Sequence, residues 1–399
     1  MKLKIHRGTK QIGGNIVEVA TESTRIILDC GKNLPPLDGK FGKDDIAING
    51  LTHGTNAYDA VFVTHYHADH CGLVERVNTD IPVYMSQDTK VVLEVISDFI
   101  DAPRPRADQV LKPGKQVRVG DISVLPLSVG HSAKGAMMFL VEADDKKLLY
   151  TGDFNHIDEA YYPLIGKADA MLCEGTNVGA RNGMTEQDIE AEAARIMRQT
   201  QGQVFVLCST TNIERVRRIE RACRTSGRTL ALDPFAKAVL DRIARMLIVE
   251  PVGFVPHYIN EEKTPRAHKY LISDIQNFSN AESIAKMTNL TFLVRQTMGK
   301  FLTNLDKLCP LNGSTLIYSM WRGYENTVPT KKFLDLCRSL GMNVEYLHTS
   351  GHAYRELLET AILRLNPGML VPIHTESAET FREMHSNVAL LEDGETLNI

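Results

Sequence analysis

The 399-residue sequence has no apolar run long enough to span a bilayer, and its first residues, MKLKIHRGTK, lack the apolar stretch of a signal peptide. Cysteine is too scarce for a disulfide framework: the seven cysteines are odd in number, scattered, and mostly set within apolar segments. Low-complexity linkers and internal repeats are absent as well. From these absences we expect a cytoplasmic protein with reduced thiols and no membrane partner.

An ordinary globular composition is spread over a long chain. Hydrophobic residues make up 43% of the sequence and charged residues 24%, which is typical of soluble domains. A chain of 399 residues exceeds the usual size of one compact domain. We therefore expect two domains.

The charge is unevenly distributed. Residues 179–344 carry 23 Lys and Arg against 16 Asp and Glu, a net charge of +7, and the rest carries 22 against 33, a net charge of −11. A basic segment in an acidic chain suits an enzyme that acts on polyanions. Arginine-rich helices that merely face solvent would give the same pattern, so charge alone does not decide between the two.

The densest group of candidate ligands directly follows the apolar run 60–63. It consists of His65, His67, Asp69 and His70. Alternate side chains of an extended segment share a face, so His65 and His67 can reach one metal ion. Asp69 and His70 fall where the chain turns and can reach a second. Because the sequence has only 13 histidines, this clustering indicates a metal site rather than chance surface histidines.

Two kinds of secondary structure are predicted along the chain. The first part favours short strands around one helix, with strands at 15–19, 25–28, 60–63, 122–129, 136–142 and 147–151 and a helix at 90–99. Strands and helices then alternate, with helices at 185–198, 212–225 and 330–340 and strands at 204–207, 229–232, 315–318 and 343–346. Thr185 is the expected N-cap of the first of these later helices, with Asp188 at N3. The alternation predicts a parallel sheet in an inserted α/β domain over 179–344, between segments 1–178 and 345–399.

Three further candidates each follow or close a predicted strand: Asp29, His131 and Asp153. Singly, each is a common turn residue. Together with the run from His65 to His70, their order resembles the signature of the metallo-β-lactamase superfamily over roughly residues 1–175. That resemblance implies an α/β (α+β) fold, an αββα sandwich with two metal ions at the mouth of its sheets.

The resemblance also implies a role for each position. The first metal ion would be held by His65, His67 and His131, the second by Asp69 and His70, and Asp153 would bridge them. Asp29 would orient an imidazole through its free ring nitrogen. Such a donor set suits two divalent ions, with Zn²⁺ the first expectation and Mn²⁺ the alternative.

The second half contains three more candidates: Glu174, His352 and His374, each at the end of an apolar run or in a turn. Taken singly, they are ordinary polar residues. In this order around an inserted domain, they resemble motifs A, B and C of the β-CASP nucleases, most closely ribonuclease J. The resemblance implies that His374 completes the second metal site and that His352 contacts the scissile phosphate. Glu174 would orient a metal-binding histidine or the attacking water.

Two segments are candidates for RNA contacts. The turn Ser350-Gly351-His352, expected to open a helix, would aim backbone N–H groups and the positive end of the dipole at an anion. The segment 319–324 holds the one tryptophan of the chain. Trp321 could stack on a base while Arg322 holds a phosphate, or Trp321 could pack in the core of the inserted domain.

We therefore expect a two-metal-dependent ribonuclease that hydrolyses single-stranded RNA, a ribonuclease J-like 5′–3′ exonuclease, endonuclease or both. Asp69 would hold or accept the proton of the nucleophile. A β-CASP nuclease acting on DNA is the nearest alternative, followed by a small-molecule hydrolase and by an inactive binding subunit. Bacterial ribonuclease J chains usually continue into a further domain, whereas this sequence ends about 25 residues after His374. A homodimer therefore stays an open expectation.

Overall fold

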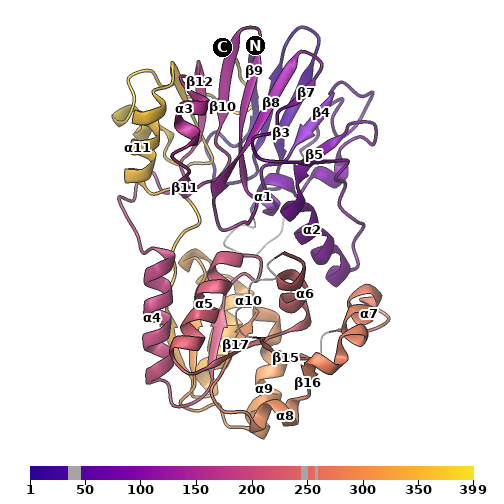
Figure 1. Cartoon of the computed structure of the whole chain (residues 1–399), viewed down its shortest axis with the longest axis vertical. Helices are drawn as coiled ribbons and strands as arrows, with labels where there is room; N and C mark the ends of the chain where they lie inside the picture. Colours follow the sequence, from indigo (N-terminus) through magenta and orange to yellow (C-terminus); the bar gives the residue numbers. More distant parts are fainter. Residues whose placement is uncertain (35–45, 244–249, 257–258) are drawn as a thin grey trace.

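The computed structural model describes residues 1–34, 46–243, 250–256 and 259–399, which form two lobes stacked along the long axis (Figure 1). The sandwich lobe contains both chain ends and the strands β1–β12, β20 and β21. The inserted lobe contains the strands β13–β19. No helix among the described residues is long and apolar enough to cross a membrane.

Two sheets face each other in the sandwich lobe. The first runs in the order β21 (Thr396–Asn398), β1 (Lys2–Arg7), β2 (Ile16–Ala20), β3 (Arg25–Cys30), β4 (Ala60–Phe62), β5 (Val83–Ser86) and β6 (Gln109–Leu111). The second runs in the order β11 (His156–Ile157), β8 (Ile122–Gly130), β9 (Met137–Ala143), β10 (Lys146–Tyr150), β12 (Ala170–Glu174) and β20 (Met369–Ile373), with β7 (Val117–Val119) beside β8. Leu28 and Phe62 of the first sheet pack with Phe139 and Val141 of the second in one buried cluster.

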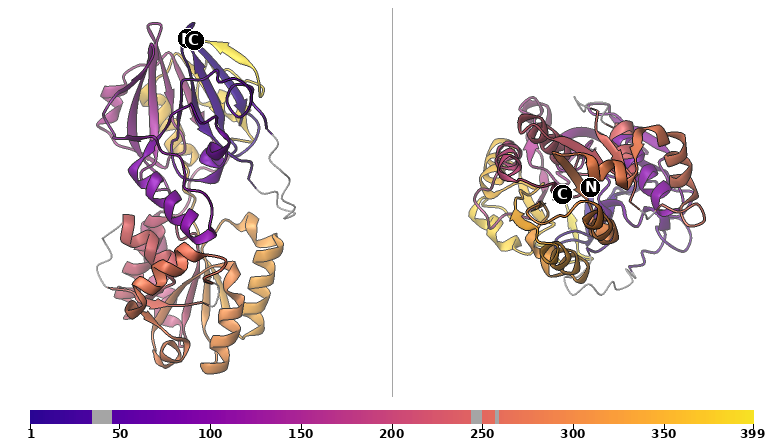
Figure 2. Two further views of the ribbon diagram at one scale, coloured as in Figure 1. Left: turned by 90° about the vertical axis from the view of Figure 1, so that its right-hand side faces the viewer. Right: turned by 90° about the horizontal axis from the view of Figure 1, so that it is seen from below.

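Helices cover the outer faces of both sheets, which gives the αββα arrangement. The second sheet packs against α11 (Arg355–Leu365) and α3 (Tyr161–Ile165), as Leu358 and Ile362 share a buried cluster with Leu149 and Met171. The first sheet packs against α1 (Ala68–Cys71) and the segments around it. The helix α2 (Gln87–Ile100) extends from this lobe and contacts α6 (Pro234–Ile243) and α7 (Pro265–Ser273) of the inserted lobe (Figure 2).

The third sheet is parallel throughout. Its order is β16 (Phe278–Ser279), β15 (Val252–Phe254), β14 (Thr229–Leu232), β17 (Leu290–Val294), β13 (Val204–Leu207), β18 (Thr315–Tyr318) and β19 (Asn343–Tyr346). This confirms the parallel sheet that the strand–helix alternation predicts. The sheet includes Glu345 and Tyr346, which lie beyond the expected boundary at 344; the division of the chain into domains stays a prediction.

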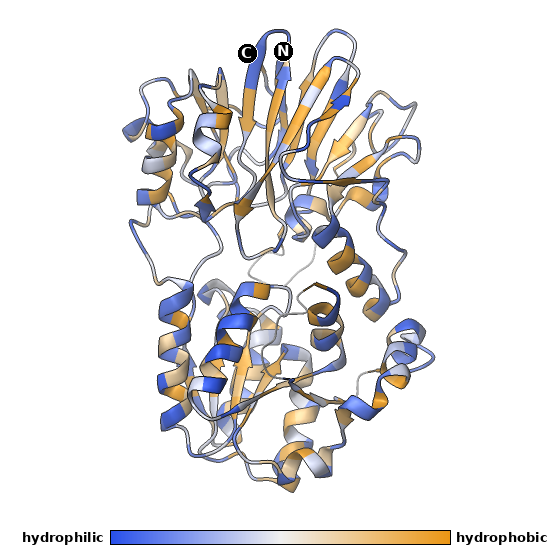
Figure 3. Cartoon of the chain, viewed as in Figure 1, coloured by the Kyte–Doolittle hydropathy of each residue, from blue (hydrophilic) through white to orange (hydrophobic). Residues whose placement is uncertain are grey.

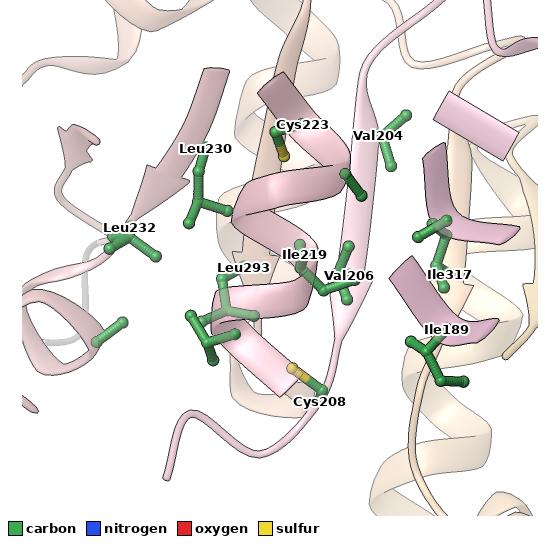
Figure 4. Packing of buried hydrophobic residues seen from close by; sticks show 14 of the residues in the cluster. Ile189, Val204, Val206, Cys208, Ile219, Cys223, Leu230, Leu232, Leu293 and Ile317 are labelled. Carbon is green, nitrogen blue, oxygen red and sulfur yellow. The ribbon is translucent and has the colours of Figure 1, made fainter. Parts of the chain in front are cut away.

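Helices cover both faces of the third sheet. One face carries α4 (Glu186–Gln199), α5 (Ile213–Thr225) and α6 (Pro234–Ile243), whose apolar side chains, such as Ile189, Ile219 and Cys223, pack against the strands (Figure 4). On the other face are α8 (Ala281–Lys286), α9 (Gly299–Leu308) and α10 (Val328–Ser339), and α7 (Pro265–Ser273) lies toward α2.

Local sequence signals account for several boundaries. The helix α4 begins after Thr185, which forms the predicted capping box with Asp188. The helix α2 begins three residues before the predicted start because Ser86 caps it by accepting from the N–H of Thr89. The prediction that a helix opens at Ser350-Gly351-His352 is wrong, since α11 begins only at Arg355.

Candidate metal centre

The predicted site residues gather at one edge of the sandwich lobe, where strands of both sheets end. Asp29 is the last but one residue of β3. Five more site residues follow or close the strands β4, β8, β10, β12 and β20; in that order they are His65, His131, Asp153, Glu174 and His374. This edge faces the inserted lobe, because the Tyr66 hydroxyl donates a hydrogen bond to the Thr211 carbonyl oxygen at 2.6 Å.

Two groups of potential ligand atoms meet at this edge. One group consists of His65, His67 and His131, whose ring nitrogens lie within 4.8 Å of one another. The other consists of Asp69, His70, Asp153 and His374, whose ligand atoms lie within the same distance. All of these residues are buried except His67, which is partly exposed.

One carboxylate oxygen lies at the centre of both groups. Asp153 Oδ2 has five imidazole nitrogens around it: His70 Nε2 at 3.0 Å, His374 Nε2 at 3.6 Å, His352 Nδ1 at 3.7 Å, His65 Nε2 at 3.8 Å and His131 Nε2 at 3.9 Å. Among the described residues, the buried atoms His65 Nε2, His70 Nε2 and both Asp153 oxygens have no hydrogen-bond partner. Buried polar atoms are rarely left unpaired. Converging lone pairs without donors between them fit the binding of divalent cations.

The surrounding contacts leave most Nε2 atoms directed to this centre. His70 Nδ1 donates to Asp29 Oδ2 at 2.8 Å, and His131 Nδ1 donates to the Gly351 carbonyl oxygen at 2.6 Å. His65 Nδ1 lies 3.0 Å from Thr64 Oγ1, and His374 Nδ1 lies 2.8 Å from Thr176 Oγ1. A partner at one ring nitrogen fixes the ring orientation and leaves the other nitrogen free for a metal ion.

The pKa values of the histidines at this edge also favour the binding of metal cations. Burial lowers the pKa of His67 to about 4 and holds the pKa of His65 and His131 well below the usual value, so these imidazoles are neutral at pH 7. Burial opposes a charge on His70 too, but the carboxylates of Asp153, Asp29 and Asp69 raise its pKa well above the usual value. The same carboxylates would attract a divalent cation, which would displace the proton from His70 Nε2.

Residues distant in the sequence fix the position of the Asp29 side chain. It accepts hydrogen bonds from the Thr64 N–H at 2.7 Å and from the Tyr150 hydroxyl at 2.8 Å, in addition to that from His70. Asp29 and His374 both have left-handed backbones, with φ of 59° and 55°. Such conformations cost non-glycine residues about 1–3 kcal/mol, so the surrounding contacts must hold them in place.

The turn before α11 does not present its amides as the sequence suggests. The N–H of His352 donates to Ser350 Oγ at 3.2 Å, and the N–H of Ala353 donates to Glu174 Oε1 at 3.2 Å. Of the three residues expected to aim backbone N–H groups at an anion, His352 therefore has its N–H already paired, and the expectation for Ser350 and Gly351 stays a prediction. The side chain of His352 is the group that this turn presents.

Glu174 and Thr176 hold that side chain. Glu174 is fully buried and its Oε1 lies 3.3 Å from His352 Nδ1, while its Oε2 accepts from the Thr176 N–H at 3.0 Å. Thr176 Oγ1 lies 3.2 Å from the same His352 nitrogen. Burial would lower the pKa of His352, but Glu174 and Asp153 raise it to about 9.

Sequence reasoning missed Thr64, Tyr150 and Thr176. Each stands within three residues of a predicted site residue, and that proximity was the one available signal. Burial and the charge of Asp69 raise the pKa of Tyr324 in the inserted lobe.

Trp321 and Arg322 lie on the surface of the inserted lobe. Trp321 is 52% exposed and meets Tyr324 edge-on with 5.4 Å between ring centroids, so the alternative that it packs in the core is wrong. The Arg322 guanidinium lies 4.4 Å from the centroid of the Tyr346 ring.

An open cleft of about 940 Å³, lined by residues of both lobes, reaches the candidate metal centre at His131 and His352. Its charged lining consists of Lys134, Arg181, Arg217 and Arg218 together with Glu186, Glu214 and Glu356. Four basic side chains thus line the cleft against three carboxylates.

Arg215, buried in the inserted lobe, connects several segments that border this cleft. Its buried guanidinium forms a two-bond ion pair with Glu186 at 2.8 and 2.9 Å. It also donates to Ser319 Oγ at 2.6 Å and to the Thr349 carbonyl oxygen at 3.0 Å. The segment just before Ser350 is therefore anchored to α4, α5 and the end of β18.

Known proteins resemble this chain over most of its length. A family model described as a beta-lactamase superfamily domain matches residues 24–208. Ribonuclease J of Sinorhizobium meliloti is 25% identical over 88% of this chain, which spans 64% of that relative's length. Ribonuclease J of Mycobacterium tuberculosis is 25% identical over 96% of this chain and 69% of its own, and ribonuclease J2 of Bacillus subtilis is 24% identical over 98% and 73%.

A solved structure shares the whole fold. The crystal structure of a protein of unknown function from Enterococcus faecalis V583 matches with a TM-score of 0.80 and 23% identity, covering 99% of both chains. The fold class predicted from the sequence is confirmed. Residues 24–208 are similar to the beta-lactamase superfamily, and most of the chain's length is similar to ribonuclease J.

Proposed function

We propose that this chain is a divalent-metal-dependent nuclease that hydrolyses the phosphodiester bonds of single-stranded RNA. The observation that carries the proposal is the buried Asp153 Oδ2, which lies between two ligand groups and 3.7 Å from Nδ1 of His352, a residue that lines the open cleft. The ribonuclease J names of the relatives support RNA as the substrate.

Seven residues would hold two ions. His65, His67 and His131 suit the first, Asp69, His70 and His374 suit the second, and Asp153 would touch both. Zn²⁺ is the first candidate for this mixed set, and Mn²⁺ the second. When bound, such ions lower the pKa of a coordinated water from 15.7 toward about 7 and offset phosphate charge.

The chain's own residues would act on the phosphate and the water. His352, whose pKa is raised to about 9, is protonated at neutral pH. Since Glu174 and Thr176 hold its Nδ1, its Nε2–H is the group left to donate to a phosphate oxygen. The pKa of Asp69 is held well below its usual range by His70 and His374 against the effect of burial, so Asp69 stays ionised. It would accept a hydrogen bond from the attacking water and keep a lone pair aimed at phosphorus.

The inserted lobe would contact the nucleoside. The exposed ring of Trp321 offers a stacking surface for a base, and Arg322, stacked on Tyr346, would hold a neighbouring phosphate.

Cleavage of end-labelled RNA tests the proposal. Chelated protein would be reloaded with Zn²⁺ or Mn²⁺ and given matched RNA and DNA strands carrying a 5′ monophosphate, triphosphate or hydroxyl. We expect RNA to be cleaved, with mononucleotides from an exonuclease or internal fragments from an endonuclease. Cleavage of DNA alone would replace RNA by DNA as the substrate, and no cleavage of either strand would overturn the nuclease proposal.

A further inference from the structure

The cleft continues beyond the lobe junction as a groove on the inserted lobe. A second cavity, of about 390 Å³, lies between α4 and α5, and Gln187 and Arg218 line both cavities. The two hollows are therefore contiguous, and the path from His352 extends along the outer side of the inserted lobe.

The groove is built from one face of each helix. Its floor is formed by the small side chains of Ala191 and Ala194, and its far end by Arg198 and Thr225. Gln187 and Arg198 are eleven residues apart on α4, so the groove is about 16 Å long at 1.5 Å per residue. The opposite faces of both helices pack on the sheet (Figure 4), and hydrophilic residues mark their outer sides (Figure 3).

The groove has more guanidinium groups than carboxylates. Glu190 is shared by Arg218 at 3.0 Å and Arg221 at 4.0 Å, and Glu214 by Arg218 at 2.7 Å and Arg217 at 3.6 Å. Arg198 is exposed and has no ion pair within the described part of the chain. The two helices together hold seven arginines and six carboxylates, and the excess of positive charge lies in the groove, whose lining has three arginines and one glutamate.

We propose that this α4–α5 groove binds the phosphates of a single strand whose other part occupies the cleft. The inference rests on the proposed nuclease function and adds a second, sequence-independent contact region to it. Arg198 and Arg221 provide charge and hydrogen-bond donors for phosphate oxygens. The small floor leaves room for an extended backbone, and the continuity with the cleft lets one strand contact both regions.

The test compares Arg198→Ala/Arg221→Ala with the wild type on oligonucleotides of about 5 and about 20 nucleotides, a range that brackets typical single-strand site sizes. We expect the KM of the long RNA to rise about tenfold and the salt dependence of its binding to weaken by about 1–2 units of slope. Turnover of the short RNA should not change, because it fills only the cleft. The matched control is Arg195→Ala, since Arg195 lies on the same helix but pairs with Glu192 outside the groove.

The binding of the long RNA by chelated protein, followed by fluorescence anisotropy, gives a readout independent of cleavage. An equal effect of the control, or equal losses for long and short RNA, would overturn the groove proposal. So would tighter binding of polyglutamate than of RNA at the groove, which would indicate an acidic protein partner. Absence of all cleavage by the wild type with intact groove binding would instead count against the nuclease function alone.

Discussion

Asp153 Oδ2 shows how much of the site depends on single atoms. It lies 3.0–3.9 Å from five imidazole nitrogens, yet it has no hydrogen-bond partner among the described residues. The imidazoles in turn are oriented by contacts at their other ring nitrogen. The Thr176 hydroxyl makes this contact with both His374 and His352. A single hydroxyl therefore couples the proposed metal ligand to the proposed phosphate contact.

Removal of that hydroxyl is expected to lower cleavage. In Thr176→Val the shape is kept but both hydrogen bonds are lost, and we expect kcat or metal affinity to fall about 10–100-fold, as is usual for residues that orient metal ligands. Thr176→Ser, which retains the hydroxyl, should recover most of the activity. Steady-state kinetics with metal titration would measure this, and full activity of the valine variant would contradict the assignment.

Glu18 provides a residue-scale prediction away from the site. It accepts hydrogen bonds from His6, Arg25 and Tyr58 at 2.8–2.9 Å. Burial would raise its pKa, but these partners lower it to about 2. Because the folded pKa lies below the unfolded value, the stabilisation is complete above the unfolded pKa and is lost as the pH falls toward about 2.

We expect Glu18→Gln to lower the free energy of unfolding by about 1–3 kcal/mol at pH 7. The difference from the wild type should shrink by more than half near about pH 3. Urea unfolding at the two pH values would measure it. A difference that stays constant with pH would show that Glu18 acts through packing alone.

At the scale of elements, the sequence predicted most of what is local. The run from His65 to His70 lies in one turn, so spacing alone brought its ligands together, and the capping box of α4 follows from Thr185 and Asp188. The contact of Tyr150 with Asp29 spans 121 positions and that of His131 with Gly351 spans 220. Neither leaves a local pattern, because the first arises only when strands of the two sheets reach the same edge and the second only when the turn before α11 lies against the end of β8.

The same limit explains the turn before α11. The sequence indicated a helix start with free amides, but Glu174, 179 positions away from Ala353, accepts one of them. The elements between β14 and β18 were not predicted; among them β15 and β16 have only three and two residues, too few for a strand pattern to stand out.

Arg215 is an element-scale anchor whose loss should slow cleavage. Lysine keeps the charge but cannot reach Glu186, Ser319 and Thr349 together, so in Arg215→Lys the Ser350–His352 turn is expected to shift. A displacement of about 1 Å can cost up to about 100-fold in rate. We expect kcat to fall at least tenfold, with a smaller change in the KM of a short RNA.

The control for this anchor is Arg195→Lys, because Arg195 also forms a two-bond ion pair with one glutamate, Glu192, but does not contact the turn. Thermal unfolding of both variants would separate stability from catalysis. A lower melting temperature of Arg215→Lys with unchanged kcat would reduce Arg215 to a purely structural role.

At the scale of the whole molecule, the charge split and the two lobes act together. The acidic remainder of the sequence includes the metal centre, and the basic segment supplies the arginines of the cleft. Sequence reasoning identified both parts but could not place them, because the cleft depends on how the lobes pack through α2, α6 and α7.

Metal binding should stabilise the folded molecule. A ligand that binds only the native state adds about 2.7 kcal/mol at 100 times its dissociation constant. We expect Zn²⁺ or Mn²⁺ to raise the melting temperature of the chelated wild type by several degrees, about 2–4 °C per kcal/mol for a large domain. Asp153→Asn should show a much smaller shift, and an equal shift in both would place the ions elsewhere.

The central claim is that two ions at this centre enable the chain to cleave RNA. The most direct measurement follows the initial rate of RNA cleavage while metal is titrated into chelated protein, with bound ions counted by native mass spectrometry. The account predicts a rate that rises to a plateau at about two ions per chain and is lost in Asp69→Ala and His67→Ala. Full cleavage in excess chelator, or undiminished cleavage by those variants, would contradict it.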